Sequence, residues 1–207
     1  MLTLHTADLL VAGPGRAPLE AGAVLVEGDR IARVGPYGEL AAGHPHARVR
    51  RWPGVLTPGL LVRGADALLE RTYHPDDLDE PADPADPADP DGMTEARWGN
   101  SARRGTQKLL ARGVVAVAGR FTVAAVRTAV VRSGLAVQAP VSYEGAASLD
   151  PFAGRERAEE AFHGVLEPGA AARFAVFAVA GPQELLERGA TSCVATVIGG
   201  RLLHRRR

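Results

Sequence analysis

Cysteine and lysine are almost missing from this chain of 207 residues. Cys193 is the only cysteine, so no disulfide can form within the chain, and Lys108 is the only lysine among 24 basic residues. No apolar run reaches the about 18 residues that a membrane span needs. Residues 1–5 lack the basic and then apolar pattern of a signal peptide. These absences predict a cytoplasmic protein with no membrane partner.

A charge excess of either sign is also missing, because 24 basic residues balance 24 acidic ones. A neutral chain has no overall field that would attract nucleic acid. Residues 205–207 are all arginine, but three charges without aromatic neighbours make a weak nucleic-acid site. We therefore expect no nucleic-acid partner. The many arginine, alanine, glycine and proline residues are typical of a GC-rich bacterial genome.

Residues 1–56 read as β structure, with short apolar runs separated by turn residues. Gly28-Asp29 lies between two such runs and predicts a two-residue hairpin, since glycine adopts a positive φ without steric cost. Residues 37–42 could form one helical turn. Pro53-Gly54 is expected to break the chain before the next strand.

A linker is predicted over residues 74–93, which contain a threefold Pro-Ala-Asp repeat. Proline at every third position blocks a helix, and the repeated carboxylates repel one another, so an extended spacer is expected. Without a fixed scaffold these aspartates do not converge on one metal ion.

The middle of the chain alternates helix and strand signals. Apolar residues on one face predict a helix over residues 95–112, with Thr94 as its N-cap. Continuous apolar residues predict a buried strand over 114–118, followed by a helix over 123–132 and a strand over 135–141. This order indicates a right-handed crossover between parallel strands.

The C-terminal part returns to short strands. Residues 155–163 are expected to form a short charged helix, and Gly199-Gly200 predicts a closing hairpin. Cys193 precedes an apolar run and is expected to be a small buried side chain. The six histidines are scattered, and we expect them at the surface, including His44 and His46 in a Gly/Pro loop.

Four phrases of this sequence resemble the amidohydrolase superfamily, in particular imidazolonepropionase and the cytosine and guanine deaminases. They are GAVLVEGDRIARVG at 22–35, PGL at 58–60, SARRGT at 101–106 and TVIGGRLLH at 196–204. A fifth phrase, at residues 166–177, resembles the segment with which these enzymes return to their β-sandwich, although Arg173 replaces the usual aspartate. The resemblance implies a mixed α/β fold in which N- and C-terminal segments form one composite β-sandwich around an inserted barrel.

The resemblance also implies a His-x-His metal pair just after the first barrel strand. The two matching positions are Gly64 and Asp66, and one carboxylate alone is not a transition-metal site. The insert of residues 57–165 is far shorter than the about 250 residues of a closed barrel. We therefore expect a barrel remnant of about three parallel strands and no catalytic, metal or cofactor-binding residue.

These expectations define two domains and three possible functions. Residues 1–56 and 166–207 would form the composite sandwich, and residues 57–165 the truncated barrel with its linker. The first hypothesis is an amidohydrolase-like protein without hydrolase activity that binds or assembles, as a homodimer or with a full-length relative. The alternatives are a metal-dependent hydrolase or deaminase of a cyclic amide or aminated ring, and a small-ligand binder.

Overall fold

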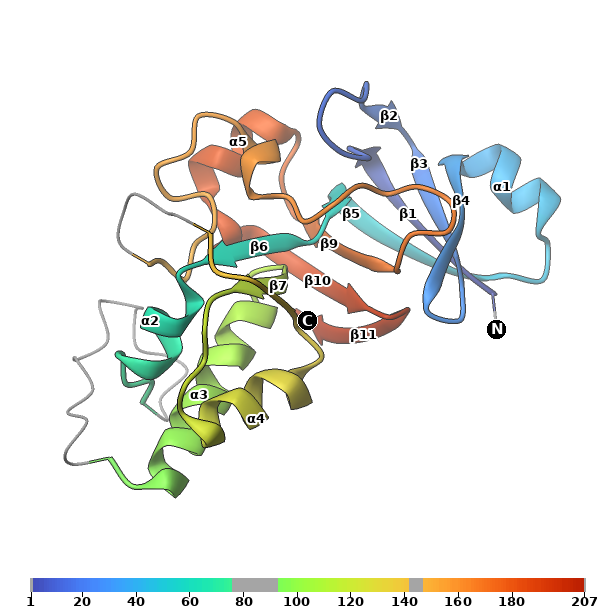
Figure 1. Cartoon of the computed structure of the whole chain (residues 1–207). Helices are drawn as coiled ribbons and strands as arrows, with labels where there is room; N and C mark the ends of the chain where they lie inside the picture. Colours follow the sequence, from blue (N-terminus) through green and yellow to red (C-terminus); the bar gives the residue numbers. More distant parts are fainter. Residues whose placement is uncertain (1, 76–92, 142–146, 207) are drawn as a thin grey trace.

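The computed structural model describes residues 2–75, 93–141 and 147–206 and shows a mixed α/β fold. A large mixed sheet occupies one side of the molecule, and a small parallel sheet with its helices occupies the other (Figure 1). Most of the predicted 74–93 linker lies outside the described residues. None of the helices in the described part is long and apolar enough to cross a membrane.

The large sheet has eight strands, drawn from both ends of the chain. Its order is β11-β10-β9-β5-β1-β3-β4, and β2 pairs with β1 beside this path. The strands are β1 (Leu2–Leu10), β2 (Leu19–Glu20), β3 (Gly22–Glu27), β4 (Arg30–Pro36), β5 (Arg48–Pro58), β9 (Arg173–Phe177), β10 (Cys193–Ile198) and β11 (Arg201–Arg205). The N- and C-terminal segments meet where β9 pairs antiparallel with β5.

Both predicted hairpins are present. Gly28-Asp29 connects β3 to β4, and Gly28 has a φ of +61°. Gly199-Gly200 connects β10 to β11, and both glycines have positive φ. The predicted helical turn is also present as α1 (Tyr37–Gly43), which covers a small apolar cluster around Leu4, Leu25 and Leu40.

The expected chain break at Pro53-Gly54 is wrong, because β5 runs through both residues. Gly54 has a φ of +79°, and its N–H donates to Asp8 Oδ2 at 2.6 Å. The pairing of β1 with β5 shifts register at the same level, between Ala7 and Leu9. A local irregularity of the β-bulge type therefore absorbs the proline and glycine without ending the strand.

The small sheet contains three parallel strands in the order β6-β7-β8, and the helices predicted over residues 95–112 and 123–132 are present. The strands are β6 (Leu60–Arg63), β7 (Val114–Ala118) and β8 (Ala136–Gln138), and the helices are α2 (Ala65–Glu70), α3 (Glu95–Leu110) and α4 (Ala124–Ser133). The hydroxyl of Thr94 accepts from the N–H of Arg97, which confirms the predicted N-cap. The third strand is shorter than predicted.

The remaining elements lie between β8 and β10. The charged helix expected over residues 155–163 is wrong in extent, since only the 3₁₀ turn η2 (Ala158–Ala161) forms. Its neighbour Phe162 instead makes an isolated antiparallel bridge with Leu60 at the start of β6. Helix α5 (Pro182–Arg188) and the 3₁₀ turn η3 (Ala190–Ser192), which were not predicted, precede β10.

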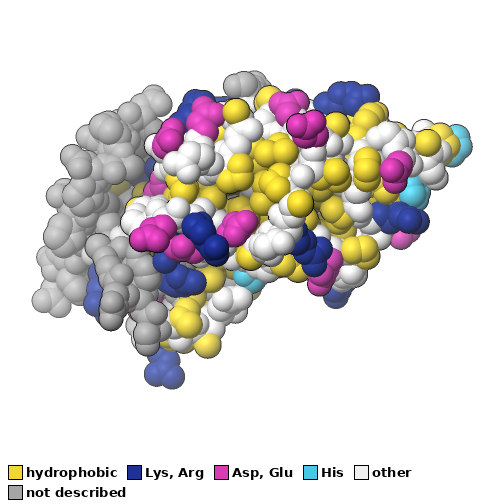
Figure 2. Space-filling model, turned by 90° about the horizontal axis from the view of Figure 1, so that it is seen from above, with side chains coloured by type: hydrophobic (Ala, Val, Ile, Leu, Met, Phe, Trp, Pro, Cys, Tyr) yellow, Lys and Arg dark blue, Asp and Glu magenta, His cyan; other side chains and the backbone are white. Residues whose placement is uncertain are grey.

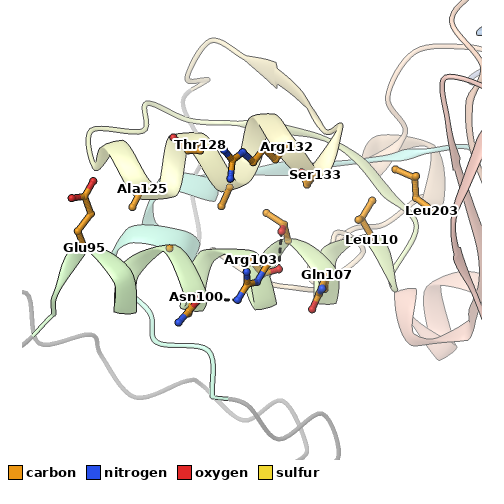
Figure 3. A pocket seen from close by; sticks show the side chains of 13 residues that line it. Glu95, Asn100, Arg103, Gln107, Leu110, Ala125, Thr128, Arg132, Ser133 and Leu203 are labelled. Carbon is orange, nitrogen blue, oxygen red and sulfur yellow. Dashed lines mark hydrogen bonds between the residues drawn. The ribbon is translucent and has the colours of Figure 1, made fainter.

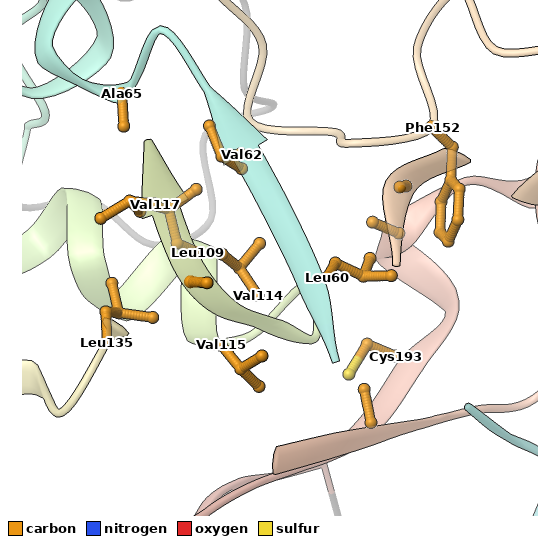
Figure 4. Packing of buried hydrophobic residues seen from close by; sticks show 14 of the residues in the cluster. Leu60, Val62, Ala65, Leu109, Val114, Val115, Val117, Leu135, Phe152 and Cys193 are labelled. Carbon is orange, nitrogen blue, oxygen red and sulfur yellow. The ribbon is translucent and has the colours of Figure 1, made fainter. Parts of the chain in front are cut away.

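The largest apolar cluster joins the two sheets. Side chains of β6, β7 and α3 meet Phe177 of β9 and Cys193 of β10, and Figure 4 shows part of this packing. Cys193 is fully buried, as predicted, and burial raises the pKa of its thiol to about 11. A second cluster, which includes Trp52, Phe174 and Val197, belongs to the large sheet.

Candidate functional site

The hinge between the two sheets is Gly59, which connects β5 directly to β6. Its N–H donates to the carbonyl of Arg173 at 3.2 Å, and the next N–H, of Leu60, donates to Gly113 at 2.9 Å. A Cβ atom at Gly59 would overlap the side chain of Val115 on β7. The hinge therefore passes from the large sheet to the small one at a place where only glycine fits.

Arg173, which stands where the resembling enzymes have an aspartate, makes a second link between the sheets. Its guanidinium donates to the carbonyl oxygens of Val115 at 3.0 Å and Gly134 at 3.1 Å. These acceptors lie on β7 and at the end of α4. Arg173 thus connects backbone of the small sheet to β9 of the large sheet.

Gly64 follows β6 and serves as the N-cap of α2, with φ +66° and ψ 28°. This left-handed conformation lets the chain turn directly from the strand into the helix. A non-glycine residue at this position would be strained. With no side chain, Gly64 offers no metal ligand.

Asp66 lies in the first turn of α2, near the carboxyl end of β7. Its Oδ1 atom is 2.5 Å from the point that a Cβ atom of Gly119 would occupy. Gly119 itself donates its N–H to the carbonyl of Gln138 at the end of β8. The structure therefore brings Gly64 and Asp66 to the strand ends where the resemblance puts the metal pair.

The divalent metal that the resemblance implies does not fit these residues. Within the ranges that the structure describes, no three His, Cys, Asp or Glu side chains are grouped closely enough to hold a metal ion. His163 has its Nδ1 atom 3.3 Å from the amide nitrogen of Gln138, at the end of β8. A lone carboxylate beside a glycine lacks the three or four protein ligands of a zinc site.

The expectation that all histidines lie at the surface is wrong for His5 and His74, each of which is only 1% exposed. His5 Nδ1 accepts a hydrogen bond from Trp52 Nε1 at 3.2 Å. Burial, with Arg50 nearby, lowers the pKa of His5 to about 3. The Nε2 atom of His74 lies 3.0 Å from the carbonyl oxygen of Leu68, and burial lowers the pKa of His74 as well.

Sequence reasoning missed a groove between α3 and α4, with a volume of about 590 Å³. Figure 3 shows Arg103 on α3 and Arg132 on α4 beside it, and Leu203 of β11 at one end. Arg103 donates to Asn100 Oδ1 at 2.7 Å, whereas Arg132 has no hydrogen-bond or ion-pair partner among the described residues. Residues of two helices and of β11 line this groove, so no single motif predicts it.

One family model matches part of the large sheet. Residues 22–47, which comprise β3, β4 and α1, match the imidazolonepropionase-like composite domain of bacteria. The similarity to this family is shown for that segment of the large sheet. The match includes the hairpin at Gly28-Asp29, one of the segments that carry the sequence resemblance.

Several solved structures are similar to parts of the chain. An ochratoxinase from A. niger is 23% identical with a TM-score of 0.47. The alignment covers 67% of this chain and 30% of the ochratoxinase chain. A guanine deaminase from Bradyrhizobium japonicum is 16% identical with a TM-score of 0.47. That alignment covers 67% of this chain and 34% of the deaminase chain. The chain thus spans about a third of the length of these proteins. No curated protein matches the sequence.

Proposed function

We propose that this amidohydrolase-like protein has no metal-dependent hydrolase activity and acts in binding or assembly. The observation that carries the proposal is the hinge, where Gly64 caps α2 and leaves Asp66 as a lone carboxylate. Hydrolysis in this superfamily needs a metal-activated water. Among the residues that the structure describes, the strand ends offer no ligand set for such a metal.

The proposal includes a division of the chain into a composite sandwich and a barrel remnant. Residues 1–56 and 166–207 would form the sandwich, since β9 pairs with β5 and the second apolar cluster combines strands from both segments. Residues 57–165 would form the remnant, since they contain the parallel β6-β7-β8 sheet. In a closed barrel β8 would pair with a further strand, whereas in the described part of the chain it is an edge strand.

The edge strand β8 supports the assembly role. Val137 in this strand is 50% exposed, and unpaired strand edges offer hydrogen-bonding groups to another chain. Figure 2 shows hydrophobic side chains gathered in the middle of a different face, the uppermost one in Figure 1, with charged side chains around them. We propose that a second copy of this chain, or a full-length relative, pairs with β8.

The test measures ring opening of cyclic amides by absorbance and ammonia release from aminated heterocycles, in buffer with added zinc, iron or manganese. We expect no turnover by the native protein above that of Asp66→Asn, because no metal-bound hydroxide forms. A turnover that depends on the metal and disappears in Asp66→Asn would contradict the proposal and favour the metal-dependent hydrolase.

The α3–α4 groove favours a second candidate function, the binding of a small ligand. Gly99 and Ala125 on facing helices provide an apolar floor, and the Arg132 guanidinium is available to an acidic group. Benzoate is a suitable probe because it combines both features. Stabilisation by benzoate that Arg132→Gln abolishes would support this candidate, and equal melting temperatures with and without benzoate would oppose it.

A further inference from the structure

The first half of β5 and the strand β11 face each other across an open seam. Residues 48–52 of β5 pair with β1 on one side, whereas β9 pairs only with Val55 to Pro58 farther along the strand. β11 pairs only with β10 and is the last strand of the sheet on the side of β5 opposite to β1. Residues of both strands line a hollow of about 340 Å³, here called the β5–β11 seam.

Arginine dominates this seam. Its lining includes Arg48, Arg50, Arg51 and Arg205, together with Trp52 and Leu202. No ion pair involves these four arginines within the described part of the chain, although the whole sequence has equal numbers of acidic and basic residues. The chain has thus concentrated positive charge in one hollow without local compensation.

One polar atom of the seam is buried without a partner. Arg50 Nε has no hydrogen-bond partner in the described structure, although this atom is hidden from solvent. A buried donor left unsatisfied costs about 1–3 kcal/mol, so such atoms need an explanation. Burial, together with repulsion from Arg48 and Arg205, lowers the pKa of Arg50. A bound anion would relieve this repulsion.

Two of the arginines are held in place by aromatic rings. The Arg51 guanidinium lies 4.7 Å from the centre of the Tyr37 ring and donates to its hydroxyl at 2.7 Å. The Arg205 guanidinium lies 5.8 Å from the centre of the Trp52 ring. The hydrogen bond to Tyr37 uses one N–H group of Arg51, and the other N–H groups of the two guanidinium groups have no hydrogen-bond partner among the described residues.

We propose that the β5–β11 seam binds a compact phosphate-class anion that carries several charges, with pyrophosphate as the simplest example. Guanidinium groups match phosphate oxygens through paired hydrogen bonds, which makes arginine the favoured residue for this chemistry. Arg48, Arg50 and Arg205 would supply these bonds. This site is separate from the hinge and does not depend on the proposed loss of hydrolase activity.

The size and floor of the seam favour a compact anion over a nucleic-acid strand. Single-stranded nucleic acid needs aromatic rings on which successive bases stack. Trp52 is only 9% exposed, its Nε1 atom donates to His5, and Arg205 covers its ring. The seam therefore offers charge without a free stacking surface.

The test is titration calorimetry of the native chain with pyrophosphate, inorganic phosphate, ATP without metal, and a single-stranded oligonucleotide. We expect pyrophosphate to bind at least about tenfold more tightly than phosphate, because it engages more guanidinium groups. Equal affinity for pyrophosphate and ATP would indicate recognition of the phosphate group itself, as proposed. Tighter binding of the oligonucleotide than of pyrophosphate would overturn the proposal.

The matched variants separate the seam from general positive charge. Arg48→Gln/Arg205→Gln changes two exposed residues of the seam, and we expect it to weaken pyrophosphate binding by about tenfold or more. Arg33→Gln/Arg71→Gln removes the same charge from exposed positions elsewhere and should bind within about twofold of the native chain. Equal losses in both pairs would overturn the proposal, as would no binding to the native chain. If the first pair fails to fold, each single substitution replaces it.

Discussion

At the scale of single residues, burial determines the properties of His5. Its ring stacks near Trp52 and lies edge-on to Phe174, and its pKa falls to about 3. The ordinary pKa of 6.5 applies to the unfolded chain. Unfolding therefore takes up a proton between these two values. The stability that neutral His5 contributes is complete above pH 6.5 and is lost as the pH falls toward 3.

We predict that the unfolding free energy of the native protein falls by about 1.4 kcal/mol per pH unit below pH 6.5 through His5. Urea unfolding at pH 6.5, 5.5 and 4.5 measures this slope. His5→Gln should have a shallower slope, because it removes the group that titrates. His46→Gln, at an exposed position, should keep the native slope. Parallel slopes for the native protein and His5→Gln would contradict the assignment.

The sequence indicated the identity of the hinge residues but not the surroundings of the histidines. Gly64 and Asp66 could be read directly because their positions follow a strand within a motif. The burial of His5 depends on pairing between β1 and β5, which brings it to Trp52, 47 positions away. Local periodicity contains no information on such a contact, so both buried histidines were missed.

At the scale of elements, α3 packs tightly at one glycine and loosely at another. A Cβ atom at Gly105 would lie 2.5 Å from Leu69 Cδ2 and 2.7 Å from His74 Cδ2. A Cβ atom at Gly99 would meet nothing nearer than Ala125 Cβ, at 3.7 Å. Both glycines lie inside the same helix, where alanine is intrinsically favoured by about 1 kcal/mol.

We predict opposite effects for the two alanine substitutions. Gly105→Ala should lower the unfolding free energy by about 1–3 kcal/mol, because buried Leu69 and His74 must move. Gly99→Ala should leave it unchanged or raise it by up to about 1 kcal/mol. Urea unfolding of the two variants and the native protein measures the difference. Two variants of equal stability would show that the contacts around Gly105 are not as described.

Long or strongly patterned elements were predictable, whereas the short helices α2 and α5 were not. The apolar periodicity of α3 was sufficient to predict that helix, and the turn glycines were sufficient to predict both hairpins. Helices α2 and α5 have six and seven residues, too few for a clear helical period. The continuation of β5 through Pro53-Gly54 depends on a contact with Asp8, which lies on another strand.

At the scale of the whole molecule, the open β8 edge predicts association. We expect light scattering after size exclusion to show a dimer for the isolated native chain. Val137→Lys should shift it to a monomer, because a charged side chain on an edge strand discourages pairing. Val49→Lys, on an exposed part of the other sheet, should leave the dimer intact. A native chain that stays monomeric at all concentrations would contradict association through β8.

The central claim is that the hinge no longer holds a catalytic metal. The most direct measurement is the metal content, by mass spectrometry, of protein purified after expression with added zinc, iron and manganese. We predict far less than one metal ion per chain, and the same content in Asp66→Asn. Stoichiometric metal in the native protein that is lost in Asp66→Asn would contradict the claim.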